Sequence, residues 1–210
     1  MPDLYSSFSG TTDDGNCTSG GQTSWANARD ADGSGGVVNV NISAASAFCN
    51  VLKQATRGGG SNYNIKRSFL CFDTSGITGT VNSATIKIYG FSQNDGSIIA
   101  VKSTAFGGDG SSALATTDFN NISGFTTGSS LAGNATTYGP QILTTSWSTS
   151  GYNNFTGTSD LRADMQNNDV VIICFMDYTN DYLNSALTSN VQLDVGGWYA
   201  ESGDASKRPY

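Results

Sequence analysis

The sequence predicts an all-β fold, an antiparallel β-sandwich or jelly roll with short helical turns in its loops, as a single domain over residues 1–210. Three observations predict it. Segments of strand length alternate apolar with polar residues, as half-buried strands require. Glycine is abundant, at 26 residues, and Asp-Gly pairs, which favour tight turns, recur between those segments. Only 13% of the residues are charged and Glu occurs once, so long solvated helices are disfavoured.

The first 36 residues are expected to be rich in loops. A single helical turn is predicted there at 23–29, with Thr23 or Ser24 as its N-cap. The first clear strand is 37–42, where valine and isoleucine alternate with asparagine, and a second strand is predicted at 47–55.

The middle of the chain holds two strong strand signals. Residues 67–73 form an apolar, β-prone run, and residues 83–91 alternate so that one side of the strand is apolar. The Asp95-Gly96 pair after the second signal is typical of a hairpin turn. We therefore expect 98–105 to return as the hairpin partner of 83–91.

Helical turns and strands are also predicted in the second half. Ser159 or Asp160 is expected to cap a short helix whose core-facing residues are Leu161 and Met165. The remaining expectations are a helical turn at 113–119, a loop at 123–130, and strands at 139–143, 152–156, 170–176 and 191–195, with 170–176 the most buried strand.

The four cysteines lack metal-binding spacing. No C-x-x-C pair occurs and the chain has no His, so the common zinc sites are excluded. Cys71 and Cys174 lie in apolar runs and are expected to be buried free thiols. For Cys17 and Cys49, spacing leaves both a disulfide and two free thiols open.

Several function classes are disfavoured because the sequence lacks the residues or motifs that they require. Without His there is no Ser-His-Asp or Cys-His triad, and no P-loop motif is present, so we expect no enzyme. A net charge of −7 without a basic stripe argues against nucleic acid as a partner. The longest apolar run, 170–176, is too short for a membrane span, and the polar start shows no secretory signal, so synthesis in a host cytoplasm is expected.

Two sets of residues are candidates for binding. Trp198, Tyr199 and Tyr182 would form a ligand-stacking platform, or alternatively pack the ends of the sandwich. No cofactor is expected, but calcium suits the carboxylate clusters if an ion binds. Those clusters contain Asp13, Asp14, Asp177 and Asp181, and the simpler interpretation is that they are solvated turn residues.

Segments 67–77 and 81–90 resemble the core of the DNRLRE-type β-sandwiches, which are carbohydrate-binding-module-like jelly rolls related to disaggregatase repeats. The shared pattern is an Arg-led apolar strand ending in Asp-Thr-Ser, an Ile-containing loop, and Ser-Ala-Thr opening an alternating strand. Weaker similarities lie at 113–119, 146–153 and 207–210, and in Trp25 with Arg29.

The resemblance implies a structural protein of a tailed bacteriophage, and it implies one more apolar strand after Tyr210, from the same chain or from a neighbouring subunit. The leading hypothesis is therefore a virion protein, a homo-oligomeric capsid decoration or cement protein that contacts the major capsid protein or other virion proteins. One alternative is a carbohydrate- or receptor-binding module of a tail fibre or spike, with a glycan as partner. Another is an accessory polysaccharide-binding domain of a secreted protein.

Overall fold

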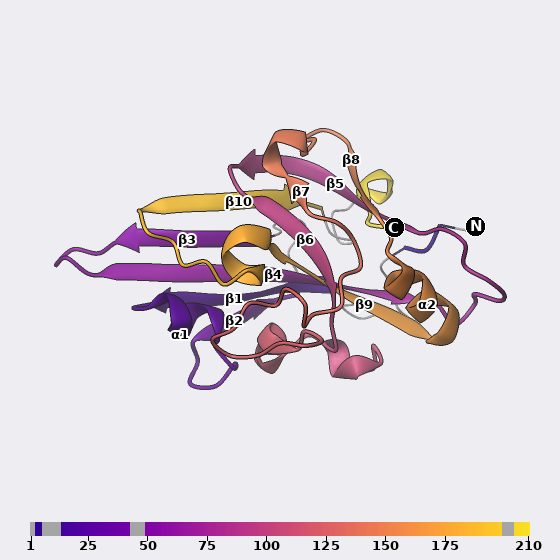
Figure 1. The fold of residues 1–210 in the computed structure, drawn as a ribbon, viewed down its shortest axis with the longest axis horizontal. Coiled ribbons are helices and arrows are strands. Elements are labelled where there is room, and N and C mark those ends of the chain that lie inside the picture. Colours follow the sequence, from indigo (N-terminus) through magenta and orange to yellow (C-terminus); the bar gives the residue numbers. More distant parts are fainter. Residues whose placement is uncertain (1–2, 6–13, 43–48, 199–203) are drawn as a thin grey trace.

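The computed structural model describes residues 3–5, 14–42, 49–198 and 204–210, and within them the chain is mostly β (Figure 1). The strands are β1 (Asp14–Gln22), β2 (Val38–Asn41), β3 (Cys49–Ala55), β4 (Ser61–Asp73), β5 (Thr85–Asn94), β6 (Ser97–Lys102), β7 (Ile142–Leu143), β8 (Tyr152–Thr156), β9 (Val170–Asp177) and β10 (Val191–Gly197). The helices are α1 (Trp25–Arg29) and α2 (Ser159–Asn167), the 3₁₀ turns η1 (Phe106–Gly108), η2 (Thr116–Asn120), η3 (Thr144–Ser146) and η6 (Ala205–Lys207), and the π-turn η4 (Tyr178–Tyr182).

All ten strands belong to one antiparallel sheet, which confirms the predicted fold class. Its main path runs β7-β6-β9-β4-β3-β10-β5-β8 and rolls into a nearly closed, barrel-like shape. The long strand β4 is the branch point of the sheet. Along one edge of β4, its first half pairs with β3 and its second half pairs with β9. Along its other edge, β4 pairs with β1. Strand β2 adds to the far side of β1.

The central strands are buried on both faces, which explains their unbroken apolar runs. In β4, Phe69 and Cys71 join one core cluster, whereas Leu70 and Phe72 join the other. The same alternation runs along β9 and β6. One cluster, which we call the inner core, lies inside the roll between β4-β9-β6 and the β5-β8 wall. The other, the outer core, lies between the opposite face of the sheet and a layer of turns and loops.

That layer of turns is made by α1, η1, η2, η4 and their connections. Helix α1 begins where the sequence predicts, because the Ser24 side chain accepts a hydrogen bond from the Asn27 backbone N–H at 3.1 Å. Its residues Trp25 and Ala28 enter the outer core. Among the helices in the described ranges, none is long and apolar enough to cross a membrane.

Three local predictions are wrong. The segment before residue 37 contains a nine-residue strand, β1, although its sequence has almost no apolar alternation. Asp95 and Gly96 do form a turn with positive φ, yet β5 pairs with β10 and β8 while β6 pairs with β9 and β7. The turn therefore joins two walls of the roll. Helix α2 is capped by Thr158, one residue earlier than expected.

The cysteines are all buried and free. This confirms the prediction for Cys71 and Cys174. It also answers the question left open for Cys17 and Cys49, which are two free thiols and not a disulfide, because Cys17 lies in the outer core and Cys49 in the inner core. Burial raises the pKa of the Cys17 thiol to about 12 and that of the Cys49 thiol well above its ordinary value. Neither thiol is ionised near neutral pH, so neither is a ready nucleophile.

Candidate functional site

Aromatic side chains gather on the outside of the β5-β8 wall. The alternation of β5 sends Ile86 and Ile88 into the inner core and leaves the intervening side chains on the outer surface. The rings on that surface come from β5, β8, the end of β10 and the two chain ends. We call this surface the aromatic face, and its members are Tyr5, Tyr89, Phe91, Tyr152, Trp198 and Tyr210.

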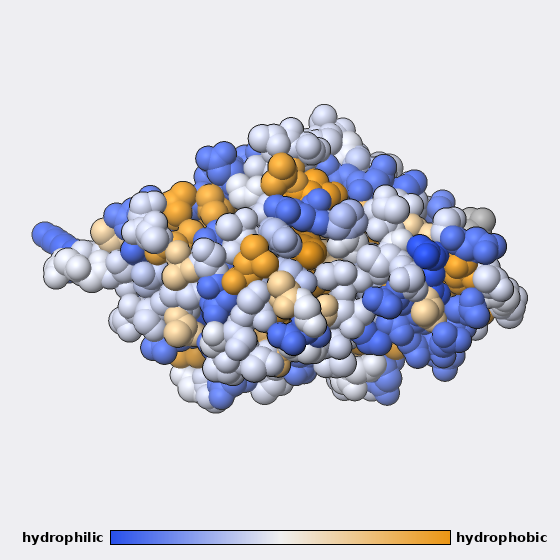
Figure 2. Space-filling view, viewed as in Figure 1, coloured by the Kyte–Doolittle hydropathy of each residue, from blue (hydrophilic) through white to orange (hydrophobic). Residues whose placement is uncertain are grey.

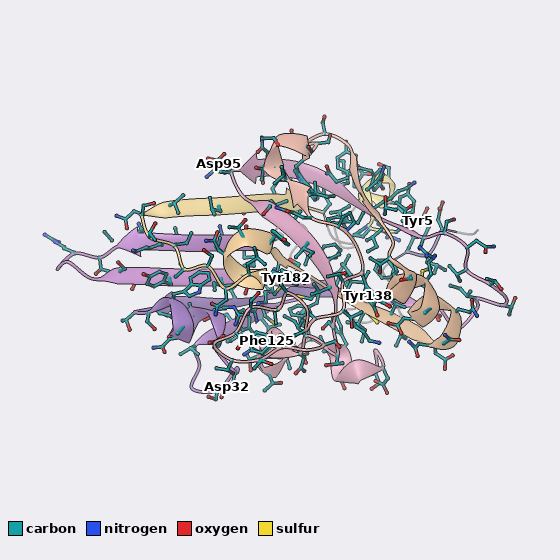
Figure 3. All side chains as sticks on the ribbon, viewed as in Figure 1. Tyr5, Asp32, Asp95, Phe125, Tyr138 and Tyr182 are labelled. Atoms are coloured by element: carbon teal, nitrogen blue, oxygen red, sulfur yellow. The ribbon has the colours of Figure 1, made fainter. Side chains whose placement is uncertain are left out.

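The rings touch one another in two groups. Tyr152 lies edge-on to Tyr89 at 5.3 Å and to Tyr210 at 5.1 Å between centroids, and Tyr5 lies 5.6 Å from Tyr210. Phe91 and Trp198 form the second group, with centroids 5.5 Å apart. Tyr5 is 46% exposed and Phe91 37% exposed, so the face presents apolar surface to solvent. Figure 3 places Tyr5 beside the chain ends, far from Tyr182 and Phe125 in the loop layer.

Two lysines lie over these rings. The Lys87 ammonium is 4.5 Å from the Tyr210 ring centroid, and the Lys207 ammonium lies 5.6 Å from Tyr89 and 5.1 Å from Trp198. Such cation–π contacts contribute about 0.5–1 kcal/mol each at exposed sites. They also cover ring faces that a stacking ligand would otherwise use.

Hydrogen bonds hold the aromatic face in one arrangement. The Tyr152 hydroxyl donates to the Ser206 carbonyl at 2.6 Å, and the Tyr89 hydroxyl donates to the Ser150 carbonyl at 2.7 Å. Lys87 and Tyr210 exchange backbone hydrogen bonds of 2.6 and 3.2 Å, which attaches the end of the chain to β5. Burial and the neighbouring tyrosines raise the pKa of Tyr152 to about 12, so its hydroxyl keeps the proton that it donates.

The structure separates the predicted stacking residues. Trp198 is part of the aromatic face, where its backbone N–H donates to the Tyr89 carbonyl at 3.0 Å. Tyr182 is only 5% exposed and stacks on Tyr178 in the outer core at 5.4 Å, so its ring packs the interior, the alternative given above. Tyr199 lies outside the described residues.

Where the structure describes them, the predicted carboxylates do not form a cation site, although Asp177 and Asp181 lie close together at η4. Asp14 is buried in β1, and Asp13 lies outside the described residues. Asp177 accepts hydrogen bonds from the Asn180 N–H at 2.6 Å and, more weakly, from the Ser97 N–H at 3.4 Å, and its burial raises its pKa to about 6. Across the described ranges, no three Asp, Glu, Cys or His side chains gather as metal ligands.

Asp181 is the acidic partner of a buried arginine. Its two carboxylate oxygens receive the Arg67 Nε and Nη2 donors at 2.7 and 2.6 Å. The other Arg67 donors bond the Phe119 carbonyl at 2.7 Å, the Asn120 side chain at 2.6 Å and the Arg29 carbonyl at 3.0 Å. All five N–H groups of the guanidinium are thus used, and Asp181 has a structural partner in place of a cation.

Sequence reasoning missed this arginine cluster. The one available signal was a charged residue, Arg67, opening an otherwise apolar strand, since a buried charge requires a partner. The identity of that partner depended on the fold, because Asp181 lies 114 residues away.

Compared with known protein families and with curated protein sequences, the chain matches neither a family model nor a curated protein. The resemblance to the DNRLRE-type sandwiches therefore stays a prediction of the sequence.

Proposed function

We propose that this chain is a non-catalytic docking domain that binds another protein through its aromatic face. The observation that carries the proposal is the set of rings on one outer surface of the β5-β8 wall, held in place by hydroxyl-to-carbonyl bonds. Tyr, Trp and Phe are enriched at protein interfaces, and rings fixed before binding lose little conformational entropy on contact.

The geometry of the face favours a protein over a sugar as partner. Lysines lie over the rings of Tyr210, Tyr89 and Trp198, and the rings meet edge to face. A sugar that stacked on these rings would have to displace the lysines. A protein surface can instead pack against the exposed ring of Phe91 and place acidic side chains near Lys87 and Lys207.

As the setting we propose the virion of a tailed bacteriophage, where the domain would decorate the capsid as a homo-oligomer in contact with the major capsid protein. This part of the proposal rests on the sequence resemblance. A decoration protein needs a rigid scaffold with a docking surface, and binding only to the assembled shell would stabilise that shell by mass action.

The test is a sedimentation assay with purified particles that have been stripped of the protein. The wild-type chain should bind, while a double variant of the aromatic face, Phe91→Ser with Trp198→Ala, should lose binding by about tenfold or more. Leu143→Ser is the matched control, because Leu143 is 52% exposed on β7, outside the aromatic face. Figure 2 shows several separate apolar patches on the side of the molecule that it draws.

Two results would separate the parts of this proposal. Absence of the protein from purified particles would remove the virion setting. Undiminished binding by the double variant would remove the aromatic face as the docking surface. A reconstruction of the particle by electron microscopy then distinguishes a regular lattice on the shell from copies at a tail tip.

Glycan recognition is a second candidate, supported by a groove that adjoins the aromatic face at Tyr152. Where the barrel stays open between β7 and β8, a groove of about 440 Å³ is lined by uncharged residues that include Gln141, Tyr152 and Asn154. Amide side chains beside a tyrosine suit the hydroxyl groups of a neutral sugar. A glycan array should give a signal that Asn154→Ala weakens, and an array without signal at millimolar sensitivity would reject this candidate.

A further inference from the structure

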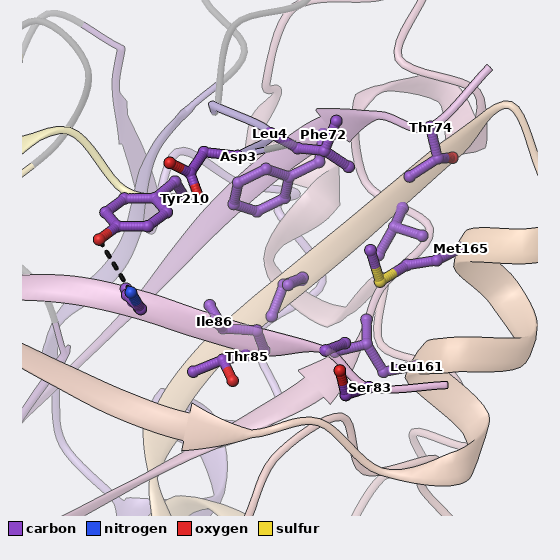
Figure 4. Close-up of a pocket in the computed structure, with 14 residues that line it drawn as sticks. Asp3, Leu4, Phe72, Thr74, Ser83, Thr85, Ile86, Leu161, Met165 and Tyr210 are labelled. Carbon is purple, nitrogen blue, oxygen red and sulfur yellow. Dashed lines mark hydrogen bonds between the residues drawn. The ribbon is translucent and has the colours of Figure 1, made fainter. Parts of the chain in front are cut away.

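A second concave site lies at the end of the roll where the two chain ends meet. It is a cavity of about 240 Å³, bounded by β4, β5, β9, α2 and both chain ends (Figure 4). The volume is a little below the ~300–1,000 Å³ of typical drug-sized pockets, so only a small molecule fits.

The two ends of the cavity differ in chemistry. Leu161 and Met165 of α2 and Val171 of β9 form an apolar end. At the opposite end Figure 4 shows the Tyr210 hydroxyl bonded to the Lys87 ammonium, with a distance of 2.9 Å. A molecule that filled this space would need an apolar body and a polar head.

Among the described residues, the polar end has hydrogen-bond donors without a partner. An ammonium has three N–H donors, and the Lys87 ammonium gives one to Tyr210. The Tyr210 hydroxyl accepts that bond and keeps its own hydrogen for another acceptor. Within the described ranges no carboxylate lies within ion-pair distance of Lys87, and Asp3 at the rim acts on it only from farther away.

We infer that the cavity binds a small amphipathic carboxylate, with its hydrocarbon chain against Met165 and Leu161 and its head on Lys87 and Tyr210. A carboxylate accepts several hydrogen bonds and matches the charge of the ammonium, and bonds of this charge-assisted kind are stronger than neutral ones. The apolar chain gains about 0.8 kcal/mol for each buried CH₂ group. The site shares Lys87 and Tyr210 with the aromatic face, but the exposed rings of Phe91 and Trp198 do not line it, so different residues test the two roles.

Decanoate below its micelle concentration is the probe, titrated into the full chain by calorimetry, with amide chemical shifts to locate it. We expect one molecule per chain, with the largest shifts at Ile86 and Val171. Lys87→Gln should weaken binding about tenfold by removing the charged donor. Lys53→Gln is the matched control, because Lys53 also lies over a tyrosine, Tyr63, at 5.6 Å, yet does not line the cavity.

A second variant separates loss of binding from loss of folding. Met165→Phe places a larger side chain in the cavity, so it should abolish decanoate binding while the melting temperature stays the same or rises. Decanol, which has the same chain without the charge, should bind more weakly than decanoate.

Three results would overturn the inference. They are no binding of decanoate to the wild type, equal affinity in Lys87→Gln, and chemical shifts confined to Phe91, Trp198 and the residues beside them. None of them bears on particle binding by Phe91 and Trp198, so this site and the docking face fail independently.

Discussion

The two faces of the central sheet are stabilised in different ways. The inner core is closed by another wall of the same sheet, so backbone hydrogen bonds between strands position the residues that cover it. The outer core is closed by turns that have no ladder, and there Arg67 and Arg29 donate hydrogen bonds to backbone carbonyls of the covering segments, while Arg67 also pairs with the Asp181 carboxylate. Irregular backbone over a core needs side-chain anchors, because its own polar groups cannot pair in a regular pattern.

The largest effect is expected at the anchor of the outer core. Arg67→Ala should lower the free energy of unfolding by about 3–5 kcal/mol, because it leaves the buried Asp181 carboxylate without its main partner. Urea denaturation measures this loss. Arg57→Ala is the control, since Arg57 is exposed in the turn before β4 and its loss should change stability by under about 0.5 kcal/mol.

Hydrogen exchange would then test whether the anchor acts locally. In Arg67→Ala the amides of η2 and η4 should lose protection before those of β5 and β8. Uniform loss across both layers would show that the two faces do not differ in the way described. Adding Asp181→Leu to Arg67→Met should recover part of the stability, since the unpaired charge is then gone.

A somewhat smaller loss is expected in the inner core. Phe155 of β8 is fully buried and packs on Trp147 and Phe175, with centroids 6.4 and 5.4 Å apart. Phe155→Ala should cost about 3 kcal/mol through the cavity it leaves. Thermal unfolding followed by tryptophan fluorescence measures it. Protection of η2 and η4 should fall only together with that of β8, in contrast to the arginine variant.

The next effect depends on pH and concerns Asp177, where β9 enters η4. Because the carboxyl is buried, its pKa of about 6 in the folded chain lies above its ordinary value. At a pH between these two pKa values, the folded chain therefore binds more protons than the unfolded chain. The contribution of Asp177 to stability therefore grows as pH falls from 7 to 5, by roughly 1–2 kcal/mol. The measurement is the difference in unfolding free energy between wild type and Asp177→Asn across that range; a constant difference would contradict the prediction.

The smallest effect is expected at the start of α1. Ser24→Ala removes the side-chain acceptor for the Asn27 N–H and should cost about 1 kcal/mol. Thr23→Ala, at the neighbouring residue that the sequence offered as an equal candidate, should leave stability nearly unchanged. Equal losses in the two variants, measured by urea denaturation, would show that the cap is shared.

Local patterns predicted most of the strands, but not which strands pair with one another. The alternation of residues 83–91 and the apolar run of 170–176 correctly predicted β5 and β9. A strand buried on one face alternates apolar with polar residues, and a strand buried on both faces is apolar throughout. Strand β1 has neither pattern, because its residues are mostly polar or glycine and become buried by pairing between β2 and β4. The Asp95-Gly96 turn was found, yet its flanking strands pair with partners that are distant in sequence.

The candidate site was predicted in part for the same reason. Trp198 was singled out as an aromatic residue near an alternating strand, and the structure puts it on the aromatic face. Tyr152 and Tyr210 were not, because their contact with each other depends on β8 and the chain end both meeting β5. The cavity at Lys87 likewise arises from segments distant in sequence.

The distance between Arg67 and Asp181 has a consequence during translation. The two residues are 114 positions apart, and β4 receives its neighbour β9 only after residue 170 has been made. At ~5–20 residues per second, the nascent chain carries an unpaired guanidinium and an uncovered apolar strand for on the order of 10 s. Slowing the ribosome between these positions is therefore expected to increase aggregation of the nascent chain.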